Sequence, residues 1–109
     1  MDLSDWDTSN VTKMNQIFFD CEKLVELNIK GWDTSNVTEM GGMFAYCDNL
    51  KKIWGIEDIN THNVIDMNQL FYVCPSLIEL DLSNWDTSNV TIMDYMFYGS
   101  YNIKNLNLS

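Results

Sequence analysis

Trp6-Asp7-Thr8-Ser9-Asn10-Val11-Thr12 is the stretch that decides the fold, because the chain repeats it. The same seven residues return at 32–38 and at 85–91, and a degenerate copy occupies 59–65. A sequence with a fixed period folds by stacking like units, each burying its apolar side against its neighbours. We therefore predict a single repeat domain over residues 1–109, with repeat cores at about 6–29, 32–56, 59–82 and 85–108.

The residues after each heptad repeat as well, in apolar columns that step by 26, 27 and 26 residues. The columns are Met14, Met40, Met67 and Met93, then Phe18, Phe44, Phe71 and Phe97, then Leu24, Leu50, Leu77 and Ile103. One extra residue lies between Ile53 and Ile59. We expect the chain to bulge at this place.

Two periodicities alternate inside each repeat. A helix of about ten residues is predicted by apolar positions i, i+3, i+7 and i+10, as in Val11, Met14, Phe18 and Cys21, with Thr8, Ser9 or Asn10 as its N-cap. A short strand is predicted by the alternation of Leu27 and Ile29. Same-handed crossovers place such strands side by side and parallel. The predicted fold class is α/β, a short right-handed solenoid of about four 26-residue β/α repeats, with a parallel sheet on one face and helices on the other.

Composition excludes several classes of partner. The chain has 16 acidic residues against six lysines and no arginine, which gives a net charge of -10. Such a chain repels phosphate groups, so we expect no binding to nucleic acid or to anionic membranes. No apolar run is long enough to cross a bilayer, so we predict no direct membrane insertion of this segment.

The chain ends do not coincide with repeat boundaries. Met1-Asp2-Leu3-Ser4 aligns with 80–83, and the last four residues, 106–109, are the same segment again. Neither end has the polar capping unit that repeat arrays need for solubility. We therefore expect a fragment of a longer array, with an upstream signal peptide missing, and self-association through the repeat ends as an alternative mode of action.

The extended pattern Trp-Asp-Thr-Ser-Asn-Val-Thr-x-Met-x-x-Met-Phe-x-x-Cys-x-x-Leu-x-x-Leu resembles the BspA-like leucine-rich repeat family of bacterial surface proteins and mycoplasma lipoproteins. The resemblance covers essentially the whole chain. The third copy departs most, with Ile59, His62 and Ile65, and the fourth has Ser100 in place of cysteine. The resemblance implies a cell-surface or extracellular location in a bacterium and a role in adhesion or protein binding.

Cys21, Cys47 and Cys74 stand one per repeat on the inward stripe. Their number is odd, and packed helices would hold equivalent residues too far apart for a disulfide. We predict buried free thiols; a zinc site is a remote alternative, because the chain has one histidine and no CxxC pair.

The Asp-Thr-Ser-Asn tetrads have two interpretations. These residue types bond backbone groups in turns and caps, and oxygen ligands on a regular ladder also occur in calcium sites. We favour the structural role, because Asn60 makes one step of the aspartate column neutral. The Asn-Val-Thr sequons at 10–12, 36–38 and 89–91 are likewise interpreted as turn residues. No metal or cofactor is predicted.

Tryptophan occurs in two settings. Trp6, Trp32 and Trp85 share a column with Ile59, which indicates core packing rather than ligand stacking. Trp54 falls on no column, and its equivalents are polar. Two orientations stay open: the strand register turns Trp54 outward, whereas the extra residue would let it turn inward and fill the bulge.

The predicted sheet face holds the candidate protein-binding residues. An exposed tryptophan beside lysines in an acidic chain is a good contact centre, and repeat arrays bind through extended faces. The candidates are Trp54, Lys51, Lys52, Glu26, Asn28, Glu79, Asp81, Asn105 and Asn107. A second aromatic surface, formed by Phe19, Tyr72 and Tyr98 on the outward side of the helices, is either a binding surface or a cover for the seam between helices.

Catalysis is not expected, because the one histidine, His62, lies in the degenerate loop with no nucleophile at a matching position. We predict a non-enzymatic protein–protein interaction or adhesion module whose ligand is a host or neighbouring-cell surface protein. The alternatives are a structural spacer that presents another domain, and self-association.

Overall fold

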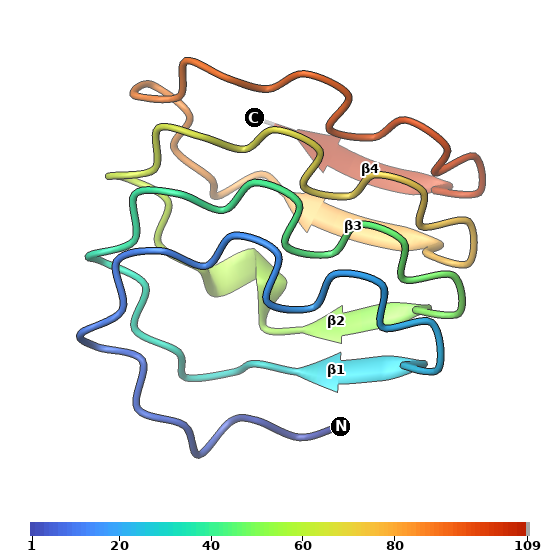
Figure 1. The fold of residues 1–109 in the computed structure, drawn as a ribbon, viewed down its shortest axis with the longest axis horizontal. Coiled ribbons are helices and arrows are strands. Elements are labelled where there is room, and N and C mark those ends of the chain that lie inside the picture. The colour runs from blue at the N-terminus through green and yellow to red at the C-terminus, as the bar shows by residue number, and fades with distance from the viewer. Residues whose placement is uncertain (109) are drawn as a thin grey trace.

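The chain winds as a coil whose successive windings stack on one another (Figure 1). The computed structural model describes the backbone of residues 1–108 and the side chains of residues 1–104 and Leu106. Each winding corresponds to one sequence repeat and is called a rung below. The strands lie side by side along one side of the coil, and they are β1 (Glu26–Asn28), β2 (Lys52–Trp54), β3 (Glu79–Leu82) and β4 (Asn105–Leu108).

The strands are parallel, but they form two sheets and not one. β1 pairs with β2 in the register Leu27↔Ile53, and β3 pairs with β4 in the register Leu80↔Leu106. The start of the chain adds a single bridge to this side, between Asp2 and Asn28. The sheet that was predicted to run along the whole face is therefore divided between β2 and β3.

The predicted helices are absent from residues 1–108, where the only helical element is the 3-10 turn η1 (Ile56–Asp58). The prediction of an α/β solenoid with helices on one face is therefore wrong. Backbone amides of the expected helix donate to the next rung, as from Met14 to the Glu39 oxygen (2.8 Å) and from Phe18 to that of Met43 (3.0 Å). Within the described residues, no helix has the length and apolar character that crossing a membrane requires.

The helical period has another physical origin, which is a pair of tight turns in each rung. In the first rung, the amides of Phe19 and Cys21 donate to the carbonyl oxygens three residues before them. Gln16 and Asp20 both have a φ of 59°, and residues at the equivalent positions of the other rungs also have positive φ. Left-handed residues cannot continue an α-helix. Two turns four residues apart nevertheless direct apolar side chains inward at spacings of three and four, which imitates a helix.

The core consists of the predicted columns, whose members stack from rung to rung. The rings of Phe18, Phe44, Phe71 and Phe97 stack at centroid distances of 5.6, 5.4 and 5.8 Å. Met14, Met40 and Met67 are buried, whereas Met93 is 43% exposed. The prediction that Met93 belongs to the core is wrong, because no described rung covers it.

The extra residue that the sequence places between Ile53 and Ile59 is accommodated directly after β2. Gly55 has a φ of 93° and precedes η1 as its N-cap, and Ile56 takes the buried position that Ile29 holds in the preceding rung. A Cβ atom on Gly55 would lie 2.7 Å from the backbone nitrogen of Lys30. The chain therefore needs glycine here both for its dihedral angle and for the close approach of the neighbouring backbone.

Candidate protein-binding face

The heptad residues are used by the fold itself. The hydroxyl groups of Thr8, Thr34 and Thr61 are buried and donate to the carbonyl oxygens of Asp33, Asn60 and Asp86 in the next rung, at 3.0, 3.0 and 3.1 Å. Asparagine side chains bond in the opposite direction, as from Asn36 Nδ2 to the Ser9 oxygen (2.9 Å). These residues bond the rungs to one another and do not cap helices.

The aspartates of the heptads close local turns. Oδ1 of Asp33 accepts hydrogen bonds from the hydroxyl (2.6 Å) and the amide (3.0 Å) of Ser35. These bonds hold the pKa of the Asp33 carboxyl below its usual value, the serine hydroxyl having the largest effect. The pKa of Asp86 is lowered further, first by Ser88 and then by His62, whose Nδ1 lies 2.8 Å from Asp86 Oδ2. In the described part of the chain, no group of three or more possible ligands is arranged to hold a metal ion.

Two of the three thiols are buried and free, as predicted. Sγ of Cys47 donates to the Phe18 oxygen (3.1 Å) and Sγ of Cys74 to the Phe44 oxygen (3.0 Å). Ser100 makes the equivalent bond to the Phe71 oxygen (2.7 Å). Burial raises the pKa of both buried thiols to about 12. Cys21 is only half-buried, because its rung lies at the end of the stack.

The tryptophan column is a packing column only in the interior. Trp32 and Trp85 are buried, and their indole N–H groups donate to the oxygens of Leu3 (2.8 Å) and Ile56 (2.9 Å). Ile59 is buried at the same position. The prediction is wrong for Trp6, which is 59% exposed and stacks on Trp32 at 6.3 Å.

Trp54 points outward, which decides between the two orientations that the sequence left open. Its side chain is 40% exposed, while Ile53 beside it is buried. The strand alternation is kept through Trp54 because the extra residue is absorbed after β2, by Gly55 and η1. The ring therefore stands on the sheet face, in register with Asn28 of β1.

Two lysines lie over the Trp54 ring. The Nζ atom of Lys52 is 4.0 Å from the ring centroid and that of Lys30 is 5.2 Å away. Both distances fit cation–π attraction. Lys51 is exposed, but its described contact is a backbone bond to Val25 (2.8 Å). Sequence reasoning missed Lys30, although the strand register would have placed it beside Trp54, since the Ile29 amide donates to the Trp54 oxygen (2.9 Å).

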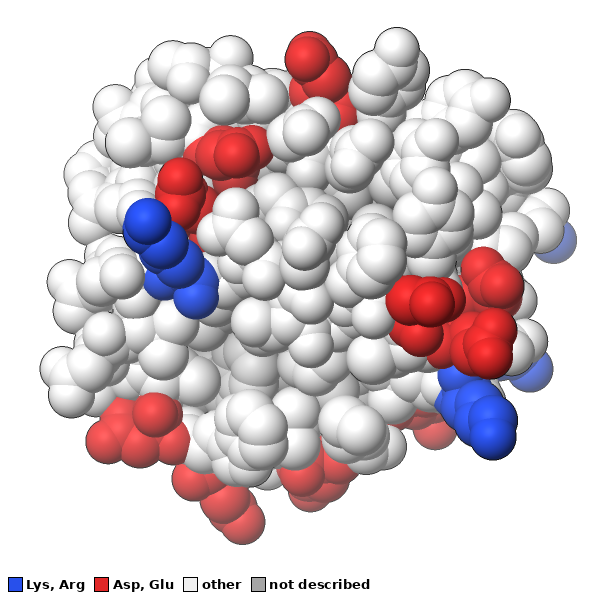
Figure 2. All heavy atoms as spheres, viewed as in Figure 1, with Lys and Arg blue, Asp and Glu red and all other residues white. Residues whose placement is uncertain are grey.

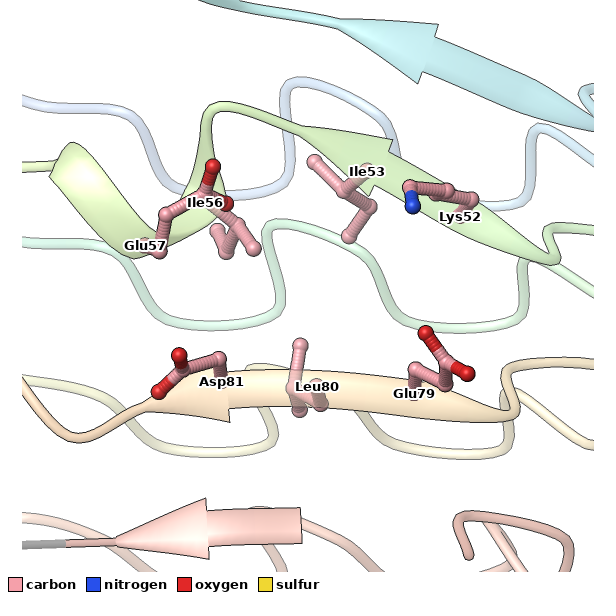
Figure 3. Close-up of a pocket in the computed structure, with 7 residues that line it drawn as sticks. All are labelled: Lys52, Ile53, Ile56, Glu57, Glu79, Leu80 and Asp81. Carbon is pink, nitrogen blue, oxygen red and sulfur yellow. The ribbon is translucent and has the colours of Figure 1, made fainter. Parts of the chain in front are cut away.

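Two hollows lie on the strand side of the molecule. The hollow between β2 and β3 has a volume of about 300 Å³, and Figure 3 shows Lys52 on one wall with Glu79 and Asp81 on the other. Glu57 of η1, which sequence reasoning did not select, also lines it. The hollow toward β1 has a volume of about 330 Å³ and is lined by Trp54, Glu26 and Asn28 together with Met1, Asp2 and Leu27.

The sheet face, defined as the outward side chains of β1 to β3, thus gathers most of the candidates. It combines one large ring, flanking ammonium groups and carboxylates on both neighbouring strands. Such a face offers an apolar contact with charged groups around it. The predicted candidates Asn105 and Asn107 have side chains outside the described residues.

Comparison with known proteins identifies one family. Residues 1–109 match a family described as "Mycoplasma protein of unknown function, DUF285". No curated protein and no solved structure matches the chain significantly.

Proposed function

This chain belongs to the DUF285 family of Mycoplasma proteins, and we propose that it is a non-enzymatic protein-binding or adhesion module of a bacterial cell-surface protein. Its partner is a surface protein of the host or of a neighbouring cell, and the contact is made through the sheet face. The observation that supports the proposal most directly is Trp54, a large ring that is 40% exposed and flanked by two lysines.

The singular character of Trp54 favours binding over a spacer role. A spacer requires only that rungs repeat, and the equivalent positions in the neighbouring strands are Asn28 and Asp81. A partly desolvated tryptophan flanked by cations is the type of residue that dominates binding energy at protein interfaces. The ring interrupts an otherwise polar sheet face at one place, which suits a localised contact.

Binding is tested with the 109-residue chain immobilised and exposed to surface-protein extracts of host cells and of neighbouring cells. Proteins that are retained are identified, purified and titrated against the chain and against Trp54→Leu. We expect at least one partner whose Kd rises about tenfold or more in Trp54→Leu, because loss of a central aromatic contact costs more than 1 kcal/mol.

Trp6→Leu is the matched control, since Trp6 is also an exposed tryptophan but lies off the sheet face. Lys52→Gln removes the nearer cation and should raise the Kd of the same partner by a smaller factor. The melting temperature of each variant establishes that it is folded. Equal retention by the wild type and folded Trp54→Leu, or retention of no protein by either, would contradict the proposal.

A further inference from the structure

A second exposed aromatic surface lies on the side of the coil opposite the strands. We call it the aromatic stripe, and its members are Phe19, Tyr46, Tyr72, Tyr95 and Tyr98. Each ring contacts the next: Phe19 to Tyr46 at 5.4 Å, Tyr46 to Tyr72 at 5.3 Å and Tyr72 to Tyr98 at 5.3 Å between centroids. Tyr95 closes the cluster against Tyr72 (6.4 Å) and Tyr98 (5.9 Å).

The stripe is not a by-product of the repeat. Its rings come from three different positions of the rung: Tyr72 and Tyr98 share the position of Phe19, but Ala45 stands there in the second rung. Tyr46 supplies the ring in that rung from the next residue, where φ is 61°, and Tyr95 comes from an earlier position with a φ of 58°. Continuity of the rings across the rungs therefore depends on individual residues.

The core does not need the stripe as a cover. The phenylalanine column beneath it is already closed, with Phe44 and Phe71 fully buried. Four of the five rings of the stripe are exposed, Tyr95 to 64%. Tyr72 at the centre is half-buried, and desolvation together with the neighbouring tyrosines raises the pKa of its hydroxyl. The rings hold one another in place, so the stripe side chains lose less conformational entropy when a partner binds.

The charges around the stripe indicate what it attracts. Figure 2 shows this side of the molecule, with an uncharged middle and charged groups toward its margins. Asp20, Asp48 and Asp94 are exposed within two residues of a stripe member, and the chain carries a net charge of -10. Among the described residues, lysines lie over the Trp54 ring alone, so the chain's own cations do not occupy the tyrosine faces.

We propose that the aromatic stripe binds a cationic, arginine-rich polypeptide segment of a partner protein. Guanidinium groups stack on tyrosine faces and pair with carboxylates, and exposed aspartates stand within two residues of stripe members in the sequence. The acidic net charge steers such a segment toward the protein from a distance. This surface lies opposite the sheet face and acts independently of the proposed Trp54 contact.

The test uses a ten-residue peptide that alternates arginine with glycine, titrated into the folded 109-residue chain and followed by NMR of the tyrosine rings. A peptide of equal length with citrulline in place of arginine keeps the shape and removes the charge. We expect shifts at stripe tyrosines with the arginine peptide only, and weaker binding at higher salt.

Variants locate the binding. Tyr98→Leu and Tyr46→Leu should each lower the affinity for the arginine peptide about threefold or more. Tyr101→Leu is the matched control, because Tyr101 is 81% exposed and outside the stripe, and Trp54→Leu tests the opposite face; neither should change the affinity. A retained melting temperature shows that each variant is folded.

Three results would overturn the proposal. The first is the absence of shifts with the arginine peptide, and the second is equal binding of the citrulline peptide or of a neutral proline-rich peptide. The third is binding that survives both tyrosine substitutions in folded protein or disappears in Trp54→Leu, which would assign the peptide to the sheet face.

Discussion

Trp6 and Trp32 begin identical heptads, yet Trp6 is 59% exposed and Trp32 only 7%. Trp32 donates its indole hydrogen to the Leu3 oxygen, which lies in the part of the chain that precedes it by one winding. No described rung lies over Trp6 in the same way. The C-terminal rung shows the same effect, because Met93 is exposed where Met67 is completely buried. Burial in this fold is thus a property of the neighbouring rung and not of the residue alone.

The fold contains two kinds of interaction, those between neighbouring rungs and those within one rung. Core burial and the threonine bonds cross from rung to rung, so a terminal rung has a described partner on one side only, although Met14 and Thr8 of the first rung are still buried. The aspartate–serine bonds close within a single rung and are the same in the first rung as in the second. Substitutions in equivalent interior and terminal positions should therefore differ strongly for the first kind and little for the second.

The largest difference is expected in the phenylalanine column. Phe44→Ala should lower the free energy of unfolding by about 3 to 5 kcal/mol, because it leaves a cavity between two stacked rings. Phe97→Ala should cost roughly half of that or less, since Phe97 is only partly buried. Urea denaturation measures the free energy of unfolding of both variants. Equal losses would show that the ends are as tightly packed as the interior.

Glycine substitutions test the close backbone contact between the first and second rungs, where Gly55 lies against Lys30. Gly55→Ala and Gly31→Ala both place a side chain at positive φ, which costs about 1 to 2 kcal/mol each. Only Gly55→Ala adds a clash, with Cβ 2.7 Å from a backbone nitrogen, whereas the nearest atom to Gly31 is 3.8 Å away. We expect the lower melting temperature for Gly55→Ala. The reverse order would mean that the backbone around Gly55 adjusts more easily than the backbone around Gly31.

Thiol reactivity compares the same column at the end and in the interior. Cys47 and Cys74 are buried, and burial raises their pKa to about 12, so both should be protected in the folded protein. The half-buried Cys21 should react with a maleimide at pH 7 roughly a hundredfold faster or more. Mass spectrometry of labelled peptides at several times gives the three rates. Similar rates for all three cysteines would show that the interior rungs open readily.

The smallest difference is expected for the local aspartate turns. The pKa values of Asp7 and Asp33 are both lowered in the folded state, mainly by the serine hydroxyl two residues later. A lowered pKa stabilises the fold above the unfolded value of 3.8, and this stabilisation is lost as the pH falls below it. Carboxyl-carbon NMR titration should give two similar, depressed values. A normal value for Asp7 alone would show that the turn depends on both neighbouring rungs.

The amino-acid sequence predicted the buried side chains of this protein well and its backbone conformation poorly. The columns of phenylalanine, leucine and interior methionine were predictable because a side chain that repeats at a fixed spacing meets its own copy in the next rung. The helix prediction failed because an apolar period of three and four residues also arises from paired tight turns. Glutamine, aspartate, tyrosine and valine at positive φ carried no signal of those turns.

The candidate site was predictable in part. Trp54 stood out because it falls on no apolar column, and Lys52 was selected as its neighbour in an acidic chain. Glu79 and Asp81 were found as polar positions of the predicted sheet. Lys30 and Glu57 were missed, because the first reaches the ring from the adjacent rung and the second is brought to the hollow by η1. The rings of the aromatic stripe were found only where they shared a column, so Tyr46 and Tyr95 were overlooked.

The repeat, its period and the inward columns follow from the amino-acid order, because identical segments must bury identical faces. The direction of the backbone hydrogen bonds, the division of the sheet at β2 and the outward position of Trp54 were decided by tertiary structure. The physical reason is the same in each case. A backbone amide has several acceptors within reach, and the stacked neighbouring rung, which lies about 26 residues away in the sequence, determines which of them it uses.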